Sequence, residues 1–559
     1  MTVGDRLAQM LAESGVDRVF GVPGGQTLPL YEGIRKSGGA ISHVLMRDER
    51  SAGFAADAYA RLTGKVGVCD ATVGPGATNL LSPLAEAHCS SIPMLAIISD
   101  IPRSWEHRRL RGNASQAMEQ LEMFKPVSKW QVTLSEPASL ENVLDQALRV
   151  AVSGRPGPVV LAVPDDVGDM DIQWQRRVRP SAVFPRHRSA PDPAQVQAAR
   201  QALAQAQKPV LLVGGGVHTS GAGQEVAQLA RLMGAPVVTT ITGKGVMAET
   251  DPQVFGVTGS MGSPKANEVV AQADLVFFIA CKAGQLATFG YDRPAPGVAT
   301  IHLDIDPEEI GRNFPDSIAL VCDARLGLAD LLAALGSDRF AYEWNLDALR
   351  QDCRQWYDQI TLRPQVPGEP LKAQAVTRLI DEAMEPGDLA VCDASLPSGW
   401  AAVYLRLKEA GRSYLAPRGL AGLGWGAPAA IGAALARPQA KRVFLFAGDG
   451  GYAFSMQELE VMVRLNLPVV TCLFNNNILG WIKHVQKARY GDNHISTDFN
   501  HIDFATVAQG FGARGYKVNS LDELRDALGK ERQPQGPAII DMNTDQWETP
   551  VLRNASGKA

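Results

Sequence analysis

Continuous apolar runs of strand length recur along the chain, and segments with the apolar spacing of helices lie between them. Typical runs are residues 66–73, 94–99, 209–216 and 442–448. Because the apolar residues in these runs are consecutive rather than alternating, we expect strands that are covered on both faces. Strands that alternate with helices build mostly parallel sheets. The sequence therefore predicts an α/β fold made of open, mostly parallel sheets.

Two irregular segments divide this pattern into three parts. Residues 174–195 are rich in arginine and proline, and residues 362–376 carry three prolines. A chain of 559 residues is too long for one hydrophobic core, so we expect three domains of ordinary size. The predicted domains and a short C-terminal tail are residues 1–173, 190–338, 365–547 and 548–559.

Charge and cysteine content narrow the class of protein. A net charge of -5 over this length does not favour nucleic acid or an anionic membrane as a partner. The seven cysteines are scattered without a CxxC pair, which is typical of a reducing compartment. Residues 419–436 are rich in glycine and alanine, which favours a tightly packed loop and helix over a membrane span. We therefore expect a cytoplasmic protein that contacts neither membrane nor nucleic acid.

The strand at residues 442–448 is followed by Asp449, Gly450 and Gly451, and the next strand ends in the asparagines 475–477. The carboxyl ends of neighbouring parallel strands meet at one edge of a sheet, so we expect these side chains to lie together. Carboxylate, amide and carbonyl oxygens suit Mg²⁺, and glycines at a helix start let a diphosphate approach backbone N–H groups. Taken alone, Gly-Asp-Gly is most often a tight turn. The asparagines favour a binding site.

Together these two segments resemble the motif of thiamine diphosphate (ThDP) enzymes, in which Gly-Asp-Gly is followed by Asn-Asn. The resemblance extends over nearly the whole chain. Residues 20–32, 47–69 and 71–87 are similar to the pyrimidine-binding domain of the acetolactate synthase group. Residues 419–436 are similar to that group's segment beneath the thiazolium ring. The resemblance implies pyrimidine-binding, central and diphosphate-binding domains, with ThDP and Mg²⁺ as cofactors.

The resemblance also assigns catalytic roles. Glu49 matches the carboxylate that bonds the pyrimidine nitrogen N1′ of the cofactor, and a partly buried carboxyl group can hold the proton that this bond needs. Without the resemblance, Glu49 is an acidic residue of the kind favoured in the first turn of a helix. Gln116 matches a glutamine that faces the reacting carbonyl, and a surface helix glutamine is an equally good interpretation.

A set of cofactor and metal contacts carries over in the same way. The implied metal ligands are Asp449, Asn476 and the backbone oxygen of Ile478. Leu423 matches the large apolar residue that wedges the cofactor into its bent shape, and two serines of the loop 393–400 supply hydroxyl donors. Packing of loops and core explains each of these residues equally well. The predicted cofactor-binding residues are Pro23, Glu49, Ser395, Ser398, Gly422, Leu423, Asp449, Gly450, Gly451, Asn476, Ile478, Leu479 and Gly480.

Two segments depart from the acetolactate synthase pattern. Residues 281–292 lack the arginines of that group's segment for flavin adenine dinucleotide (FAD) and the substrate entrance. For the central domain FAD, an ADP-like group, a CoA nucleotide and a purely structural sheet stay open. The loop after the asparagines also differs, and its His484 is either a proton donor or part of a solvated basic helix. The predicted substrate pocket is Gly24, Ser115, Gln116, Trp481 and Ile482.

The resemblance predicts that the enzyme decarboxylates a 2-oxo acid and joins the product to a second carbonyl. A ThDP lyase or decarboxylase of the oxalyl-CoA, 2-hydroxyacyl-CoA or benzaldehyde lyase kind, acting on an acyl or aldehyde substrate, is the alternative. Residues 209–223 raise the possibility of a nicotinamide oxidoreductase, but they lack a clean GxGxxG with a following acidic partner. Glu49, Asp449 and Asn476 argue against a non-catalytic partner subunit. The resemblance also implies a homodimer or homotetramer with active sites at the subunit interface.

Overall fold

The computed structural model describes residues 1–173 and 181–550. The predicted irregular segment 174–195 therefore begins, and the predicted tail 548–559 ends, outside the described residues. Within the described ranges no helix is long and apolar enough to cross a membrane. The chain forms two compact units. The first combines residues 1–187 with 417–439 and 454–467, and the second combines residues 188–416 and 440–453 with those from 468 onward.

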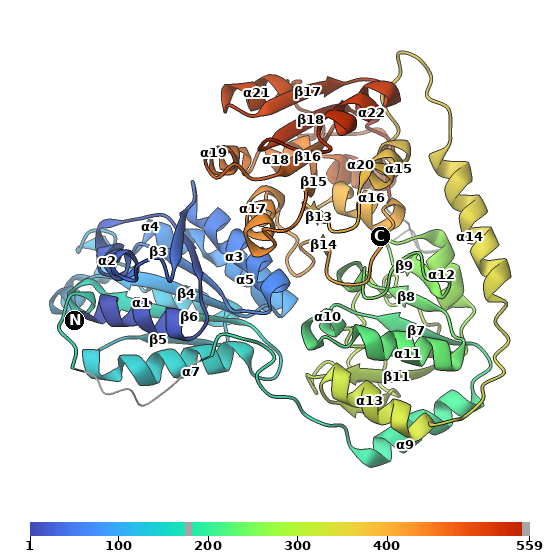
Figure 1. Cartoon of the computed structure of the whole chain (residues 1–559), viewed down its shortest axis with the longest axis horizontal. Coiled ribbons are helices and arrows are strands. Elements are labelled where there is room, and N and C mark those ends of the chain that lie inside the picture. Colours follow the sequence, from blue (N-terminus) through green and yellow to red (C-terminus); the bar gives the residue numbers. More distant parts are fainter. Residues whose placement is uncertain (174–180, 551–559) are drawn as a thin grey trace. The chain divides into compact units, whose positions relative to one another are not determined.

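Three six-stranded sheets form the framework, and all strand pairs in them are parallel (Figure 1). This confirms the predicted α/β fold with three open, parallel sheets. In the first unit the strand order is β2 (Ser42–Leu45), β1 (Arg18–Gly21), β3 (Gly67–Ala71), β4 (Met94–Asp100), β6 (Pro158–Pro164), β5 (Trp130–Thr133).

The second unit contains the other two sheets. The strand order of the middle sheet is β12 (Ile318–Val321), β11 (Ala299–Asp304), β10 (Leu275–Ile279), β7 (Pro209–Val213), β8 (Val237–Thr239), β9 (Val254–Val257). That of the third sheet is β14 (Tyr414–Leu415), β13 (Leu389–Cys392), β15 (Val443–Gly448), β16 (Val469–Asn475), β18 (Ala538–Asn543), β17 (Arg514–Val518).

Helices cover the sheets in both units. Those of the first unit are α1 (Val3–Glu13), α2 (Leu28–Lys36), α3 (Glu49–Thr63), α4 (Pro75–Asn79), α5 (Leu81–Ser90), α6 (Gln120–Phe124), α7 (Leu140–Val152), α8 (Asp165–Gly168), α17 (Gly426–Ala436) and α19 (Leu459–Arg464). Those of the second are α9 (Pro193–Gln205), α10 (Gly216–Ser220), α11 (Gly223–Met233), α12 (Pro264–Ala271), α13 (Ala324–Leu335), α14 (Leu346–Thr361), α15 (Ala373–Ala383), α16 (Leu396–Tyr404), α18 (Asp449–Tyr452), α20 (Gly480–Tyr490), α21 (Phe504–Gly510) and α22 (Leu521–Lys530).

Helix α3 is buried along most of its length. Its N-cap residue Asp48 accepts hydrogen bonds from the N–H groups of the first turn, and its C-cap Gly64 has a φ of 68°. Helix α17, which comes much later in the chain, packs directly on it. A Cβ atom on Gly432 of α17 would lie 2.1 Å from the carbonyl oxygen of Ala55, so only glycine allows this approach. The late segment is therefore part of the first unit's core.

A buried ion pair in the loop after β8 joins that loop to the end of helix α16. The Lys244 ammonium lies 2.6 Å from the carboxylate of Glu249 and also donates to the carbonyl oxygens of Ala402 and Leu405 at the end of α16. Lys244 is 1% exposed. A buried charge with a carboxylate and two carbonyl partners is fully compensated, so it fixes these segments in one arrangement.

Candidate active site

In the first unit, the loops that follow β1 and β3 meet at the carboxyl edge of the first sheet. Gly24 follows β1, and a Cβ atom on it would lie 2.4 Å from the side chain of Thr72, just after β3. The Thr72 hydroxyl donates a hydrogen bond to the Gln26 side chain at 3.0 Å. Because ligands of open α/β sheets bind at this edge, these loops form one side of the candidate site.

Glu49 and Gln116 both lie at the short turn 74–76 of this edge. Glu49 is the first residue of α3, and its Oε2 atom accepts a hydrogen bond from the Asn79 amide at 2.9 Å. Its Oε1 atom lies 3.1 Å from where a Cβ on Gly76 would stand. The carbonyl oxygen of Gln116 lies 2.3 Å from where a Cβ on Gly74 would stand. The two predicted catalytic residues are thus brought together by the glycines of one turn.

Ser115 and Gln116 belong to a loop with a small core of its own. Both are exposed, and both lie between the buried residues Ala114 and Ala117, which pack with neighbouring apolar side chains of the sheet edge. Arg109 ties the loop together, since its Nη1 atom donates to Asp100 and to the carbonyl oxygen of Met118, each at 2.9 Å. Gln116 has a φ of 65°, a conformation that costs energy for a residue with a side chain. The loop is therefore built to present these two residues.

Glu86 holds the segment that carries Gly422 and Leu423. The sequence did not predict a role for Glu86. The backbone N–H groups of Gly419, Leu420 and Ala421 donate to the Glu86 carboxylate at 2.9, 2.7 and 2.9 Å. Glu86 is 1% exposed. Burial acts to raise its pKa. The Arg61 charge, the Ser90 hydroxyl and the backbone donors outweigh that effect and hold the pKa below its usual range. The sequence indicates this buried role of Glu86 by a single acidic residue within the apolar residues 83–87.

The second unit contains the other predicted cluster, at the carboxyl edge of the third sheet. Gly448 pairs with Phe474 in the ladder between β15 and β16, so Asp449 comes next to the asparagines that end β16. Asp449 is 6% exposed. Burial raises its pKa to about 6, although backbone N–H groups of Gly450, Asn477 and Asn476 act in the opposite direction. A buried carboxylate of this kind favours a cation beside it.

The neighbouring residues Asn475 and Asn476 have different hydrogen-bond partners. Asn475 is 2% exposed, and its amide nitrogen donates to Asp541 at 2.9 Å and to the carbonyl oxygen of Ile502 at 3.0 Å. Asn475 is therefore a structural residue that holds the end of β16. Asn476 instead accepts, among the residues that the structure describes, one long hydrogen bond of 3.3 Å from the backbone N–H of Ile478. Its side-chain oxygen remains suited to a metal ligand, as the sequence predicts.

Two more loops reach the same edge. A Cβ on Gly480 would lie 2.7 Å from Leu396 at the start of α16, and a Cβ on Gly450 would lie 3.2 Å from Leu479. Ser395 has a φ of 73°, and the hydroxyl of the fully buried Ser398 donates to its carbonyl oxygen at 2.8 Å. The Ser398 hydroxyl proton is thus used within the loop, whereas Ser395 carries no such bond among the contacts described.

The residues after Gly480 differ in their surroundings. Trp481 packs against the core of the third sheet, while Ile482 is 46% exposed. His484 lies 2.7 Å from the carbonyl oxygen of Gln546 and stacks on Trp547 with ring centroids 6.2 Å apart. These contacts give His484 a role in fastening the C-terminal segment to α20. Ile482 is therefore the residue of this helix start that faces outward.

The predicted site residues fall into two sets. The first unit contains Pro23, Gly24, Glu49, Ser115, Gln116, Gly422 and Leu423. The second contains Ser395, Ser398, Asp449, Gly450, Gly451, Asn476, Ile478, Leu479, Gly480, Trp481 and Ile482. Among the described residues no three histidine, cysteine, aspartate or glutamate side chains form a metal cluster. A cation at Asp449 would therefore be held by one carboxylate with amide and carbonyl oxygens, a donor set that fits Mg²⁺ with water and phosphate ligands.

In the middle sheet, three glycines form the turn between β7 and α10. Cβ atoms on Gly214, Gly215 and Gly216 would lie 2.2, 2.9 and 2.8 Å from Ala280, Thr242 and Ala280 respectively. Packing of the turn between β7 and α10 against the neighbouring loops thus explains these glycines. Arg412 covers this turn, since its Nη2 atom donates to the carbonyl oxygen of Gly215 at 3.2 Å.

Comparison with known proteins follows the same three-part division. Three family models match, described as "Thiamine pyrophosphate enzyme, N-terminal TPP binding domain" over residues 1–123, "central domain" over residues 196–332 and "C-terminal TPP binding domain" over residues 393–542. A probable acetolactate synthase large subunit of Methanococcus aeolicus is 33% identical, with 98% of this chain and 92% of that protein covered. The chain belongs to the thiamine pyrophosphate enzyme family.

Other relatives agree with this membership. A probable acetolactate synthase large subunit of Methanocaldococcus jannaschii is 33% identical, and the matched region covers 98% of this chain and 93% of that protein. The acetolactate synthase large subunit of Parasynechococcus marenigrum is 34% identical over 97% of this chain and 87% of its own length. This member of the thiamine pyrophosphate enzyme family is therefore acetolactate synthase-like over nearly its full length. Thiamine pyrophosphate is the compound abbreviated ThDP above.

Proposed function

We propose that this chain is a ThDP- and Mg²⁺-dependent enzyme of the acetolactate synthase kind, which decarboxylates a 2-oxo acid and joins the remaining acyl unit to a second carbonyl. With pyruvate as both substrates, two pyruvate ions and one proton would give one acetolactate ion and CO₂. When bound, ThDP supplies the carbon nucleophile and the electron sink for such reactions. The observation that carries the proposal is the placement of Glu49 and Gln116 at one turn of a sheet edge.

The residues of the first unit would activate the cofactor and orient the substrate. Asn79 holds one oxygen of Glu49, which leaves Oε1 as the atom that holds or releases a proton at the cofactor's pyrimidine ring. Gln116 would donate an amide hydrogen bond to the carbonyl oxygen of the substrate. Leu423, on the segment fixed by Glu86, would support the bent cofactor from its apolar side.

The residues of the second unit would bind Mg²⁺ and the diphosphate of the cofactor. Asp449, Asn476 and the backbone oxygen of Ile478 would hold Mg²⁺, whose positive charge would stabilise the bound diphosphate. Gly450 and Gly451, which carry no side chain, would let the diphosphate approach the backbone of the turn at the end of β15. Ser395 would add a hydroxyl hydrogen bond. Trp481 and Ile482, together with Gly24 and Ser115, would set which acyl group fits.

We propose that the active enzyme is a homodimer or homotetramer with its active sites at the subunit interface, as the family resemblance implies. A cytoplasmic location is part of the same proposal, and the cysteines support it because no disulfide joins any of them in the described residues. The central domain is proposed to be a structural sheet, which the tight packing of its glycine turn supports.

Reconstitution with ThDP and Mg²⁺, followed by mass spectrometry of products, tests the function. Incubation with pyruvate should release one CO₂ per acetolactate formed, and Glu49→Gln should lose at least about a hundredfold in turnover, the usual size of an acid–base contribution. Unchanged thermal unfolding of the variant would show that the fold is kept. Activity on acyl-CoA or aldehyde substrates without any product from 2-oxo acids would overturn the proposal, as would wild-type turnover by Glu49→Gln.

A further inference from the structure

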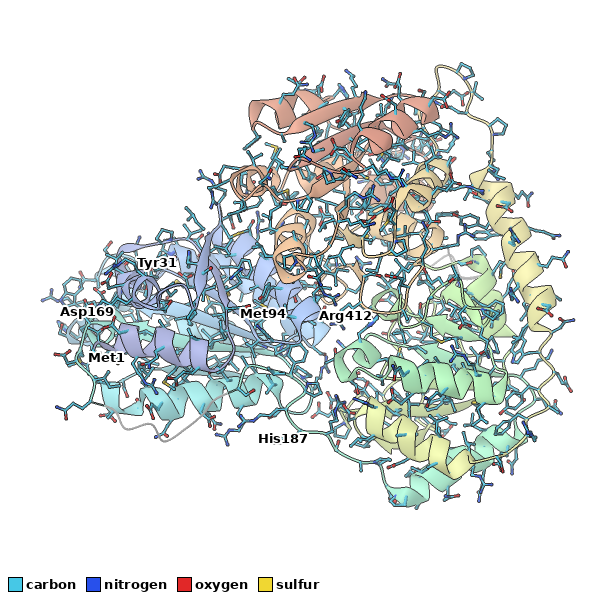
Figure 2. All side chains as sticks on the ribbon, viewed as in Figure 1. Met1, Tyr31, Met94, Asp169, His187 and Arg412 are labelled. Atoms are coloured by element: carbon cyan, nitrogen blue, oxygen red, sulfur yellow. The ribbon has the colours of Figure 1, made fainter. Side chains whose placement is uncertain are left out.

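The loop that follows β4 leads to Gln116 and is strongly basic. Its residues 103–111 include four arginines and one glutamate, in a chain whose net charge is negative. In Figure 2, Met94 marks the start of β4, and the loop leaves the other end of that strand. A concentration of cationic side chains beside a predicted catalytic residue attracts anionic ligands. The function proposed above gives these arginines no role.

Two of the four arginines fasten the loop to the rest of the first unit. The Arg103 guanidinium donates to the Asp166 carboxylate at 2.9 Å and to the carbonyl oxygen of Ser135 at 2.8 Å. Arg109 donates to the Asp100 carboxylate at 2.9 Å. Because charge-assisted bonds of this kind are strong, these two arginines are used to hold the loop in one conformation.

The other two arginines, Arg108 and Arg111, are exposed. Among the described residues, the arginine–carboxylate pairs of this loop are made by Arg103 and Arg109 instead. The Nε atom of Arg108 donates to Nε2 of His107 at 3.1 Å, a contact that steadies the guanidinium without neutralising its charge. Arg111 has a φ of 52°, a conformation that costs energy for a residue with a side chain. The loop therefore presents two charged guanidinium groups to a ligand.

Backbone contacts join both arginines to the segment 115–116. The carbonyl oxygen of Arg108 accepts a hydrogen bond from the N–H group of Ala114 at 2.7 Å. A Cβ atom on Gly112, the residue after the second arginine, would lie 4.0 Å from the carbonyl oxygen of Ala117. Ala114 and Ala117 are the residues on either side of 115–116. The two cationic residues and the predicted carbonyl-binding glutamine thus belong to one folded loop.

We propose that Arg108 and Arg111 bind the carboxylate of the second 2-oxo acid, the substrate that accepts the acyl unit. The proposal rests on the reaction given under the proposed function. In that reaction the carboxylate of the first substrate leaves as CO₂, and a cation bound to it would stabilise the reactant and oppose its loss. The carboxylate of the second substrate stays in the product. A guanidinium offers that group two parallel N–H donors, while Gln116 would bind the adjacent carbonyl oxygen.

This assignment makes the loop select the second substrate. An aldehyde presents a carbonyl group without a carboxylate, so the arginines contribute nothing to its binding. With benzaldehyde as the second substrate, one pyruvate ion, one benzaldehyde and one proton would give one hydroxyketone and CO₂. Pyruvate and benzaldehyde compete after the same first step. The ratio of acetolactate to hydroxyketone therefore reports the binding of the second substrate alone.

Mass spectrometry of both products tests the proposal on the full chain reconstituted with ThDP and Mg²⁺. In a mixture of pyruvate and benzaldehyde, Arg111→Gln should lower the ratio of acetolactate to hydroxyketone about tenfold or more, the effect of losing one hydrogen bond to a charged group. Arg108→Gln should change the ratio in the same direction. Arg35→Gln is the matched control and should keep the wild-type ratio, because the Arg35 side chain on α2 of the same unit is 71% exposed.

Binding without turnover provides a second measurement. The probe 2-hydroxy-2-methylpropanoate has the carboxylate and the hydroxyl-bearing carbon of acetolactate but no carbonyl group to react. In calorimetry it should bind Arg111→Gln about tenfold or more weakly than wild type, and Arg111→Lys, which keeps the charge without the planar fork, should lie between them. A wild-type product ratio in both glutamine variants, or equal loss of both products, would overturn the inference. Wild-type protein that forms neither product from a 2-oxo acid would instead refute the proposed function itself.

Discussion

Replacement of Glu86 by glutamine should loosen the segment that carries Leu423. The side chains have nearly the same shape, so the change removes a charge and replaces one acceptor oxygen by an N–H₂ group. In wild type that carboxylate accepts three backbone N–H groups from residues 419–421 and lies 3.3 Å from the Arg61 guanidinium. Because Arg61 keeps Asp57 as a partner at 2.9 Å, the main cost is a buried backbone donor left without its acceptor, about 1–3 kcal/mol.

Hydrogen exchange read by mass spectrometry measures this cost where it arises. If about 3 kcal/mol of it is local, the amides of Gly419, Leu420 and Ala421 should exchange about a hundredfold faster in Glu86→Gln. Glu122→Gln is the control, since the Glu122 side chain is 61% exposed and pairs with Lys125 at the surface. Exchange of these three amides within a few-fold of wild type would refute the reasoning, because the carboxylate would then not hold the segment.

The pH dependence of the same contact follows from the lowered pKa of Glu86. When the pKa of a carboxyl group is lower in the folded protein than in the unfolded chain, ionisation of that group stabilises the fold. For Glu86 the pKa in the unfolded chain is 4.5, so the contribution is complete well above pH 4.5 and is lost as the pH falls through the pKa of the folded protein. The difference in unfolding temperature between wild type and Glu86→Gln should therefore be full at pH 7 and shrink below pH 4.5.

Three further outcomes are expected. Asp449→Ala should weaken Mg²⁺-dependent ThDP binding at least about a hundredfold in calorimetry, because a divalent cation loses its one carboxylate ligand; Asp522→Ala, which alters a side chain 92% exposed, should bind as wild type. Gly74→Ala should displace Gln116 and lower turnover at least about tenfold, since the new Cβ would lie 2.3 Å from that carbonyl oxygen at a φ of 70°; Gly38→Ala, at a φ of 65° with open space around it, should keep wild-type turnover. Lys244→Met should lower the free energy of unfolding by about 3–5 kcal/mol, because Glu249 would stay buried without its partner; an unchanged urea midpoint would contradict this.

The sequence predicts the fold because its strongest signals are local. Uninterrupted apolar runs identify the covered strands, and the rule that parallel strands end at one edge predicts that Asp449 and the asparagines meet. The division of work between Asn475 and Asn476 is not visible in the sequence. It depends on Asp541, a residue on the adjacent strand β18 that is far along the chain.

Buried polar networks are the part of the candidate site that the sequence does not reveal. Glu86 and Asp70 each stand alone among apolar or small residues, where no periodicity indicates their partners. Glu86 is bonded by the backbone of Gly419–Ala421, and Asp70 by Tyr31 and His43. These partners are far away in the sequence and come together only in the folded chain. A single acid inside a covered strand or helix is nevertheless a usable signal, because its burial requires partners.

The packing of α17 on α3 has a consequence for how this chain is divided in the laboratory. Residues 1–187 look like a separable module, yet Gly432 packs on the backbone of Ala55 in α3, and the indole N–H of Trp425 lies 2.9 Å from Asp57 of the same helix. A fragment ending at residue 187 would expose these parts of α3 and leave the Asp57 carboxylate without this donor. Such a fragment should aggregate, and adding back a peptide of residues 417–439 should restore its solubility.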